Sequence, residues 1–368
     1  MRRSTATRAP ACMPTTTVAI PASLDLPSVL AFTERVATLP DSDEYVLDFD
    51  RMRHVEPFGM LLVSSEIRKL ARRNCAPKIV CSNFKHHTYA AHMGFFRSFD
   101  LAHGNAPGEA RGSSNYLPIT ILETAEVEQE AFRAGVEVGA QIEAISGRMS
   151  AMLCGEDAGA MFDTLTYSIR EIVRNVVEHS GAERFGICAQ HWPSKRRVEV
   201  AILDKGIGLR ASLSRNPHID TSDDKKAVNY ALMPAVSGKA FKGARQRRGN
   251  WINSGFGLYM TNRICRNGGN FFIASGDTGM LLTRGEGKRY YSCAFDGTAV
   301  RMTMDTSRLA GLRDALAQYR DEGFEFQRRY SEIVNIDPSA ASLMLSEDFK
   351  TSALDRLLAR LRVARLTD

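Results

Sequence analysis

Three polar side chains recur at four-residue intervals in the segment SIREIVRNVVEHS, residues 168–180: Glu171, Asn175 and His179. Residues four apart on a helix drift by only about 40°, so a helix here carries all three on one face. An asparagine offers a neutral oxygen to a hard cation such as Mg²⁺, and a carboxylate one turn earlier could accept a proton. The solvated face of an ordinary helix gives the same pattern, so both interpretations stay open for this segment alone.

A second group of polar residues follows the β-rich run VAILD. Asp204 ends that run, and Gly206 and Gly208 come directly after it. A carboxylate at the end of a strand can accept hydrogen bonds from an exocyclic amine, and glycines let a ligand approach the backbone. A plain turn between a strand and a loop is the alternative.

Two further turns contain glycine and precede a helix and a strand. In NSGFGLYMTNRI, Gly255 and Gly257 precede a predicted helix whose first N–H groups could hold a phosphate. In DGTAVRMTM, Gly297 and Thr298 open a strand, and the threonine hydroxyl could reach a phosphate or a bound water. Neither segment is a Walker A or a GxGxxG motif, and simple packing or a β-turn accounts for each by itself.

The elements that must position these residues alternate between strands and helices, which indicates an α/β protein. Strands are predicted at 17–22, 45–52, 78–82, 116–124, 184–192, 197–206, 270–277, 289–295 and 298–306. Helices are predicted at 28–39, 57–74, 86–99, 126–152, 158–180 and 257–269. The polar segment 210–255 lacks periodicity and is predicted to be a long irregular loop, of the kind that is often functional.

Composition limits the class of protein. With 368 residues, 44% hydrophobic and 24% charged, the chain predicts two or three folded domains. Its apolar runs are too short to span a bilayer, so no membrane partner is expected. Seven cysteines without a CxxC pair favour reduced thiols and a cytoplasmic location. The net charge of +6 comes without interleaved aromatic and basic residues, which argues against nucleic acid.

In this order and spacing, the four segments resemble the histidine-kinase-like (GHKL, or Bergerat) ATPase superfamily. EIVRNVVEHS resembles its N box, DKGIG its G1 box, GFGL its G2 box, and GTAVRMTM its closing strand. The resemblance covers about residues 160–305. It implies a two-layer α/β sandwich that binds ATP and Mg²⁺.

The resemblance also implies a role for each matching residue. Asn175 would hold Mg²⁺, Glu171 would be the candidate general base, and Asp204 would take the adenine amino group. The segment 210–255 becomes the ATP lid, whose basic run would contribute phosphate contacts. The other nucleotide-binding residues would be Gly206, Gly208, Lys239, Lys242, Gly255, Gly257, Leu258 and Thr298.

The chain differs from known members of these families at two places. No histidine occurs between 126 and His179. The helix that carries the phosphoacceptor histidine of a histidine kinase is therefore missing. Within the superfamily, the chain most resembles the anti-sigma serine kinases. The first unit weakly resembles a STAS domain in YVLDFDRMRHVEPFGMLLVSSEIRKLARRN. Where phosphorylatable STAS domains carry Ser or Thr, this chain has Pro57 and Phe58, so a docking role is expected instead of regulated phosphorylation.

The sequence therefore predicts five units along the chain and a function. The expected units are a disordered 1–16, a STAS-like domain 17–104, a linker and first strand 105–125, an ATPase domain 126–306 and a helical extension 307–368. The expected function is a Mg²⁺·ATP-dependent ATPase or serine/threonine kinase. The alternative is a non-catalytic, ATP-gated interaction switch. A protein partner would bind the STAS-like domain or the carboxyl-terminal helices, and a homodimer is left open.

Overall fold

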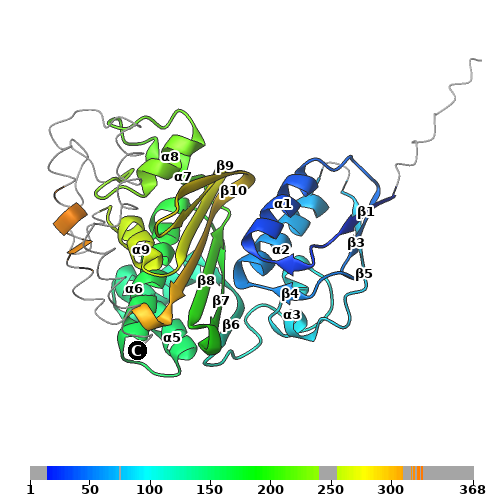
Figure 1. Ribbon diagram of the computed structural model, residues 1–368, viewed down its shortest axis with the longest axis horizontal. Coiled ribbons are helices and arrows are strands. Elements are labelled where there is room, and N and C mark those ends of the chain that lie inside the picture. The colour runs from blue at the N-terminus through cyan, green and yellow to red at the C-terminus, as the bar shows by residue number, and fades with distance from the viewer. Residues whose placement is uncertain are drawn as a thin grey trace, which may run out of the picture.

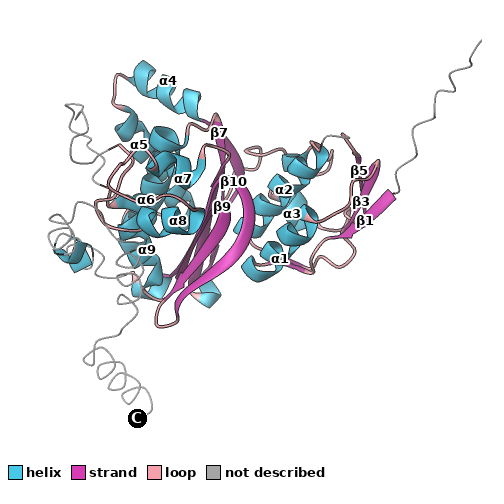
Figure 2. Ribbon diagram, turned by 90° about the horizontal axis from the view of Figure 1, so that it is seen from above, coloured by secondary structure: helices cyan, strands magenta, loops and turns pink. Residues whose placement is uncertain are grey.

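The computed structural model describes residues 15–73, 76–239, 255–309 and a few positions between 316 and 325. They form an α/β protein in which helices and sheets alternate in layers (Figure 1). Seen edge-on, the larger sheet has one set of helices on one face and the amino-terminal helices on the other, with a smaller sheet beyond them (Figure 2). The α/β class predicted from the sequence is confirmed.

The larger sheet has the strand order β6–β7–β8–β10–β9 in the described part of the chain, and all neighbours are antiparallel. Its strands are β6 Tyr116–Glu123, β7 Arg184–Trp192, β8 Arg197–Asp204, β9 Asn270–Thr283 and β10 Gly287–Asp305. The helices on its inner face are α4 Thr124–Ala134, α5 Val138–Cys154, α6 Ala160–Asn175, α7 Gly208–Leu213, α8 Asp224–Ala231 and α9 Gly257–Arg266.

Strand β8 is buried on both faces, which explains its unbroken apolar run. Val200 and Ile202 face the helices of the inner side, and Ala201 and Leu203 face the amino-terminal unit. Because side chains alternate along a strand, Asp204 falls on the inner face. The strand therefore carries its terminal carboxylate into the space beneath α6 and α9.

The amino-terminal unit is a small parallel sheet covered by helices on the side that faces the rest of the chain. The strands β1 Thr15–Ala19, β3 Glu44–Asp48 and β5 Lys78–Ser82 pair in the order β1–β3–β5. A short parallel pair joins β2 Ser23–Leu24 to β4 His54–Val55. The helices are α1 Leu26–Ala37, α2 Pro57–Ala71 and α3 Thr88–His92, and α1 is capped by Asp25, whose carboxylate accepts from Ser28 N at 3.0 Å.

Helices α1 and α2 pack directly on the outer face of the larger sheet. That face carries small side chains, Ala201, Ala274 and Ala299, which let the helices approach closely. Phe58 at the start of α2 meets Phe272 edge to face, with ring centroids 5.4 Å apart. The two units therefore share one continuous apolar core.

Several predicted elements differ from the observed ones. The single helix predicted over 126–152 is two helices, because Gly135 adopts a left-handed φ of +66° and ends α4. The three predicted carboxyl-terminal strands are the two long arms of one hairpin, β9 and β10. The predicted irregular loop is wrong over its first half, where α7 and α8 form, and residues 240–254 lie outside the described part.

Predictions for the two ends of the chain are tested only in part. Residues 15 and 16, expected to be disordered, begin β1, and the first fourteen residues lie outside the described part. Most of the helical extension predicted over 307–368 also lies outside it. Within the described residues, no helix has the length and apolar character needed to cross a membrane.

Candidate functional site

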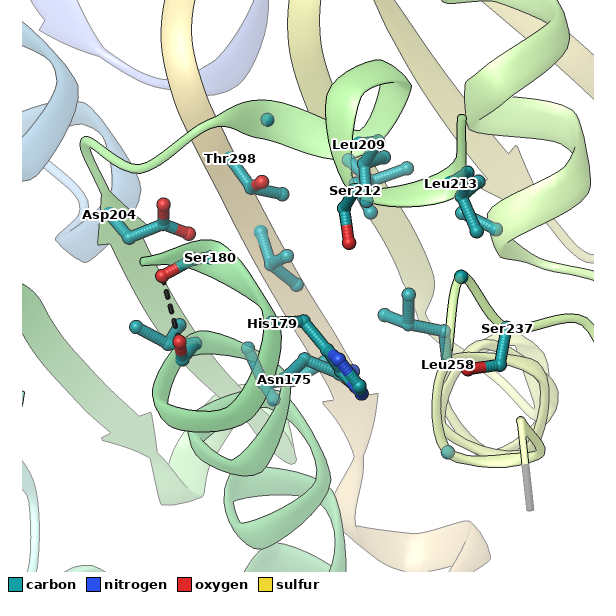
Figure 3. Close-up of a pocket in the computed structure, with 18 of the residues that line it drawn as sticks. Asn175, His179, Ser180, Asp204, Leu209, Ser212, Leu213, Ser237, Leu258 and Thr298 are labelled. Atoms are coloured by element: carbon teal, nitrogen blue, oxygen red, sulfur yellow. Dashed lines mark hydrogen bonds between the residues drawn. The ribbon is translucent and has the colours of Figure 1, made fainter. Parts of the chain in front are cut away.

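A pocket opens on the inner face of the larger sheet, between the end of α6, the end of β8, the middle of β10, and the helices α7 and α9 (Figure 3). The four segments singled out in the sequence are far apart along the chain, and the fold brings all of them to this pocket. The predicted site residues that line it are Asn175, Asp204, Gly208, Gly255, Gly257, Leu258 and Thr298.

The N-box-like segment forms one wall of the pocket. The stripe Leu165, Ile169 and Val173 is fully buried and fixes α6 against the sheet. After Asn175 the helix widens into one π-helical turn, Val176–Ser180, a distortion that often occurs at functional positions. The amino-acid spacing alone gives no sign of this turn.

The side chain of Asn175 faces the pocket with an unused polar atom. Its Nδ2 is buried and has no hydrogen-bond partner among the described residues. A buried amide end without a partner is costly, and the amide can turn over to present its oxygen instead. The residue therefore suits a polar ligand or a hard cation in this pocket.

Asp204 lies at the sheet end of the pocket, and its side chain is almost completely buried. Its Oδ1 accepts from Gly206 N at 2.8 Å. Burial raises the pKa of this carboxyl to about 6, against the opposing effects of the Gly206 and Thr298 N–H groups and the charge of Lys205. A desolvated carboxylate with spare acceptor capacity is suited to receive N–H donors from a ligand.

His179 lines the pocket one turn beyond Asn175. Burial, and then the nearby cations Lys239, Arg174 and Arg215, lower the pKa of this imidazole to about 4. The ring is therefore neutral at physiological pH. It contributes a polar surface to the pocket and no charge.

Two of the predicted glycines pack closely against the N-box-like helix and the turn that follows it. A Cβ at Gly206 would collide with the carbonyl oxygen of Ser180, and Gly206 itself is not part of the lining. Gly257 is part of the lining, and a Cβ there would collide with the Glu171 carboxylate. Because these contacts involve the end of α6, both glycines hold their segments against the N-box-like helix.

Glu171 and the predicted lysines are placed differently from the other site residues. Glu171 lies behind Gly257, outside the pocket lining, and its Oε1 accepts from Arg170 at 2.8 Å. Lys239 donates its ammonium to the carbonyl oxygen of Glu178, at the edge of the pocket. Lys242 lies outside the described residues.

The structure adds site residues that the sequence did not indicate. Leu209 and Ser212 come from α7, and Ser237 and Gly238 come from the segment before residue 240. Figure 3 shows Ser212 and Ser237 on the side of the pocket opposite Asp204. All four lie where the sequence shows no helical or strand periodicity, so no pattern pointed to them.

A comparison of the sequence with known proteins found no matching family model and no similar curated protein. The case for a ligand therefore depends on the pocket itself. A buried carboxylate could accept hydrogen bonds from a polar ligand, an amide oxygen could hold a hard cation, and the glycines keep the backbone close to the space between them.

Proposed function

We propose that this chain is a Mg²⁺·ATP-binding regulatory protein of the histidine-kinase-like ATPase type. The observation that carries the proposal is the convergence of four distant segments on one pocket, with Asp204 at one end and Asn175 on the wall that the end of α6 forms. The antiparallel sheet with helices on its inner face supports a Bergerat fold. The bound cation would neutralise phosphate charge.

Different residues of the pocket would bind different parts of the nucleotide. The ionised Asp204 carboxylate would accept a hydrogen bond from the adenine amino group, and Thr298 beside it would support the same end. Gly255, Gly257 and the first turn of α9 would offer backbone N–H groups to the phosphates. Asn175 would orient the Mg²⁺ with its side-chain oxygen, because Mg²⁺ prefers oxygen ligands and keeps several waters.

Two functions are compatible with such a pocket. In a kinase or ATPase, Glu171 would act as the general base. One observation favours the alternative, an ATP-gated switch without chemistry: the Glu171 carboxylate is paired with Arg170 and lies outside the pocket lining. Phosphoryl transfer would require that carboxylate to leave Arg170 and reach the pocket.

The amino-terminal unit supports a STAS-like docking domain that is not regulated by phosphorylation. Phe58 is 1% exposed, packed between α2 and the larger sheet. A Cβ at Gly59 would collide with the carbonyl oxygen of Leu24. A kinase could not reach this turn without separating the two units, so a partner would dock elsewhere on the domain.

Replacing Asn175 by alanine tests the cation site. ATP affinity measured by calorimetry with Mg²⁺ is expected to fall about tenfold or more, the size of one hydrogen bond to a charged group, and to change little without Mg²⁺. The control is Asn115→Ala, on an exposed side chain far from the pocket. Equal affinities for wild type and Asn175→Ala in Mg²⁺ would show that the site is assigned wrongly.

Replacing Glu171 by glutamine separates the two functions. If the chain is a kinase or ATPase, phosphate release or transfer from labelled ATP is expected to fall about 100-fold or more, with ATP affinity nearly unchanged. The matched control is Glu143→Gln, whose carboxylate lies 3.7 Å from the same Arg170 and also outside the pocket. ATP binding with no turnover in the wild type, alone or with a partner, would leave the switch as the function.

A further inference from the structure

A second cleft lies on the other side of the sheet, where α2 diverges from the ends of β6, β7 and β8. Its volume is about 670 Å³, within the range of pockets that hold small organic ligands. Its floor is apolar and includes Leu61, Ile119 and Leu203. Ile121 also lines it and is 41% exposed.

The walls of this cleft carry an excess of positive charge. Among the residues that line it, five are cationic and two are acidic. The acidic Asp296 is already paired with Lys69 at 3.2 Å, and Arg68 donates to the carbonyl oxygen of Ser98 at 3.1 Å. The other cationic residues are Arg72, Arg184 and Lys205.

Two of these cations have no anionic partner in the described part of the chain. Arg72, directly after α2, and Arg184, at the start of β7, take part in no ion pair there. Ser65, on the same wall, has a buried hydroxyl without a hydrogen-bond partner. Guanidinium groups bind carboxylates and phosphates through two parallel hydrogen bonds. An apolar floor below such groups suits an anion that has an apolar body.

The cleft and the nucleotide pocket share two backbone segments. Ser180 lines the pocket, and the next six residues, 181–186, line the cleft. Asp204 faces the pocket, while its neighbours Leu203 and Lys205 line the cleft. The two segments are joined by a hydrogen bond from Ile207 N to Ser180 O of 2.8 Å, with Gly206 packed against the same carbonyl.

We propose that this cleft binds a small organic anion, a carboxylate or phosphate monoester with an apolar body, and that its occupancy changes the affinity of the nucleotide pocket. The anion would lie on the apolar floor with its charged group between Arg72 and Arg184. Because the segments 180–186 and 203–205 each contribute residues to both cavities, ordering them from one side changes their position on the other. Such coupling acts equally in both directions. Only the coupling rests on the proposed function, since anion binding does not require ATP.

The binding experiment uses the full chain with octanoate and phenyl phosphate as probes, and octanamide and benzyl alcohol as neutral counterparts. Saturation-transfer NMR and calorimetry are expected to detect at least one of the anions and neither neutral compound. The variant Arg72→Gln/Arg184→Gln is expected to lose at least about tenfold in anion affinity. The control Arg133→Gln/Arg289→Gln, with two arginines outside the cleft, is expected to bind like the wild type.

Each other result contradicts one part of the proposal. Failure of both anions to bind, equal binding of the neutral compounds, or full affinity in Arg72→Gln/Arg184→Gln would overturn the anion site. ATP affinity is expected to change about fivefold or more at saturating anion. Anion binding with unchanged ATP affinity would overturn the coupling, whereas anion binding without any ATP binding would overturn the proposed nucleotide function and leave the anion site standing.

Discussion

Adenosine affinity is expected to fall about tenfold when the pH is lowered from 7.5 to 5, because the Asp204 carboxyl has a pKa of about 6. The ionised carboxylate is the stronger acceptor for the exocyclic amine, so affinity is full at pH 7.5 and is lost as the pH falls through about 6. His179, with a pKa of about 4, stays neutral over this range and does not contribute. Calorimetric titration at a series of pH values measures the effect, and adenosine avoids the titration of phosphates.

The variant Asp204→Asn provides the control for this pH dependence. It is expected to bind adenosine and ATP at least about 30-fold more weakly at pH 7.5, the loss of one charged hydrogen bond at a buried site, and to show no dependence between pH 5 and 7.5. A wild-type affinity that is flat over this interval would contradict the role given to Asp204.

The same carboxyl makes an opposite prediction for the stability of the ligand-free chain. Because its folded pKa is raised, protonation favours the fold, and the free energy of unfolding declines as the pH rises through about 6. Asp204→Asn removes that ionisation. Its free energy of unfolding at pH 7.5 is therefore expected to be no lower than that of the wild type, so weak binding by this variant would not reflect unfolding.

The substitution Arg301→Met is expected to lower the free energy of unfolding by about 3–5 kcal/mol, because it leaves two buried carboxylates with a single cation between them. Arg301 contacts Glu56 at 3.1 Å and Glu199 at 2.9 Å, and the side chains of these three residues are at most 7% exposed. Arg197 completes the cluster, at 2.9 Å from Glu56 and 2.5 Å from Glu199. Glu199 also accepts from Phe58 N, at the start of α2, at 3.1 Å.

This cluster joins the two units, since Glu56 belongs to the amino-terminal unit and the other charged members to the larger sheet. Burial raises the pKa of Glu56, but the hydrogen bond from Arg197 and the charges of Arg301 and Arg197 outweigh it and hold the pKa below its usual value. The contribution of Glu56 to stability is therefore complete at neutral pH and is lost as the pH falls through that lowered pKa.

Urea denaturation followed by circular dichroism measures the effect of Arg301→Met. The matched control is Arg289→Met, which breaks an exposed pair with Glu286 at 2.8 Å and is expected to change stability by less than about 1 kcal/mol. A second variant, Arg301→Met/Glu199→Leu, is expected to recover part of the loss because it also removes the deepest carboxylate. Equal losses in Arg301→Met and Arg289→Met would mean that the cluster does not hold the units together.

The sequence determined the local elements and the parts of the site that depend on them. The apolar stripe of 160–175 and the β-rich run that ends at Asp204 each predict one element with one buried face, and the structure has both. Residues spaced along one helix, or standing at the end of one strand, keep that relation in any fold. For this reason Asn175, Asp204, Gly208 and Gly255 could be singled out without coordinates, and all four line the pocket.

Only the tertiary structure decided the features that depend on contacts between distant segments. Glu171 has the spacing of a catalytic residue, but its pairing with Arg170 and its place behind Gly257 follow from how α9 packs on α6. The helices α7 and α8 carry weak periodicity of their own and form against the pocket and β9.

The cleft and the Glu56–Arg197–Glu199–Arg301 cluster also depend on contacts between distant segments. In the sequence, Glu199 is one polar residue in an apolar strand, and the alternation of β8 puts it on the outer face of the sheet. Its partners come from positions 58, 197 and 301, and Arg301 also contacts Glu56, which is 245 residues away in the sequence. Periodicity indicates which face of its element a side chain occupies. The surface that packs against that face is set by the fold of the whole chain. Here the amino-terminal unit packs on the outer face of the sheet whose inner face carries the proposed ATP site.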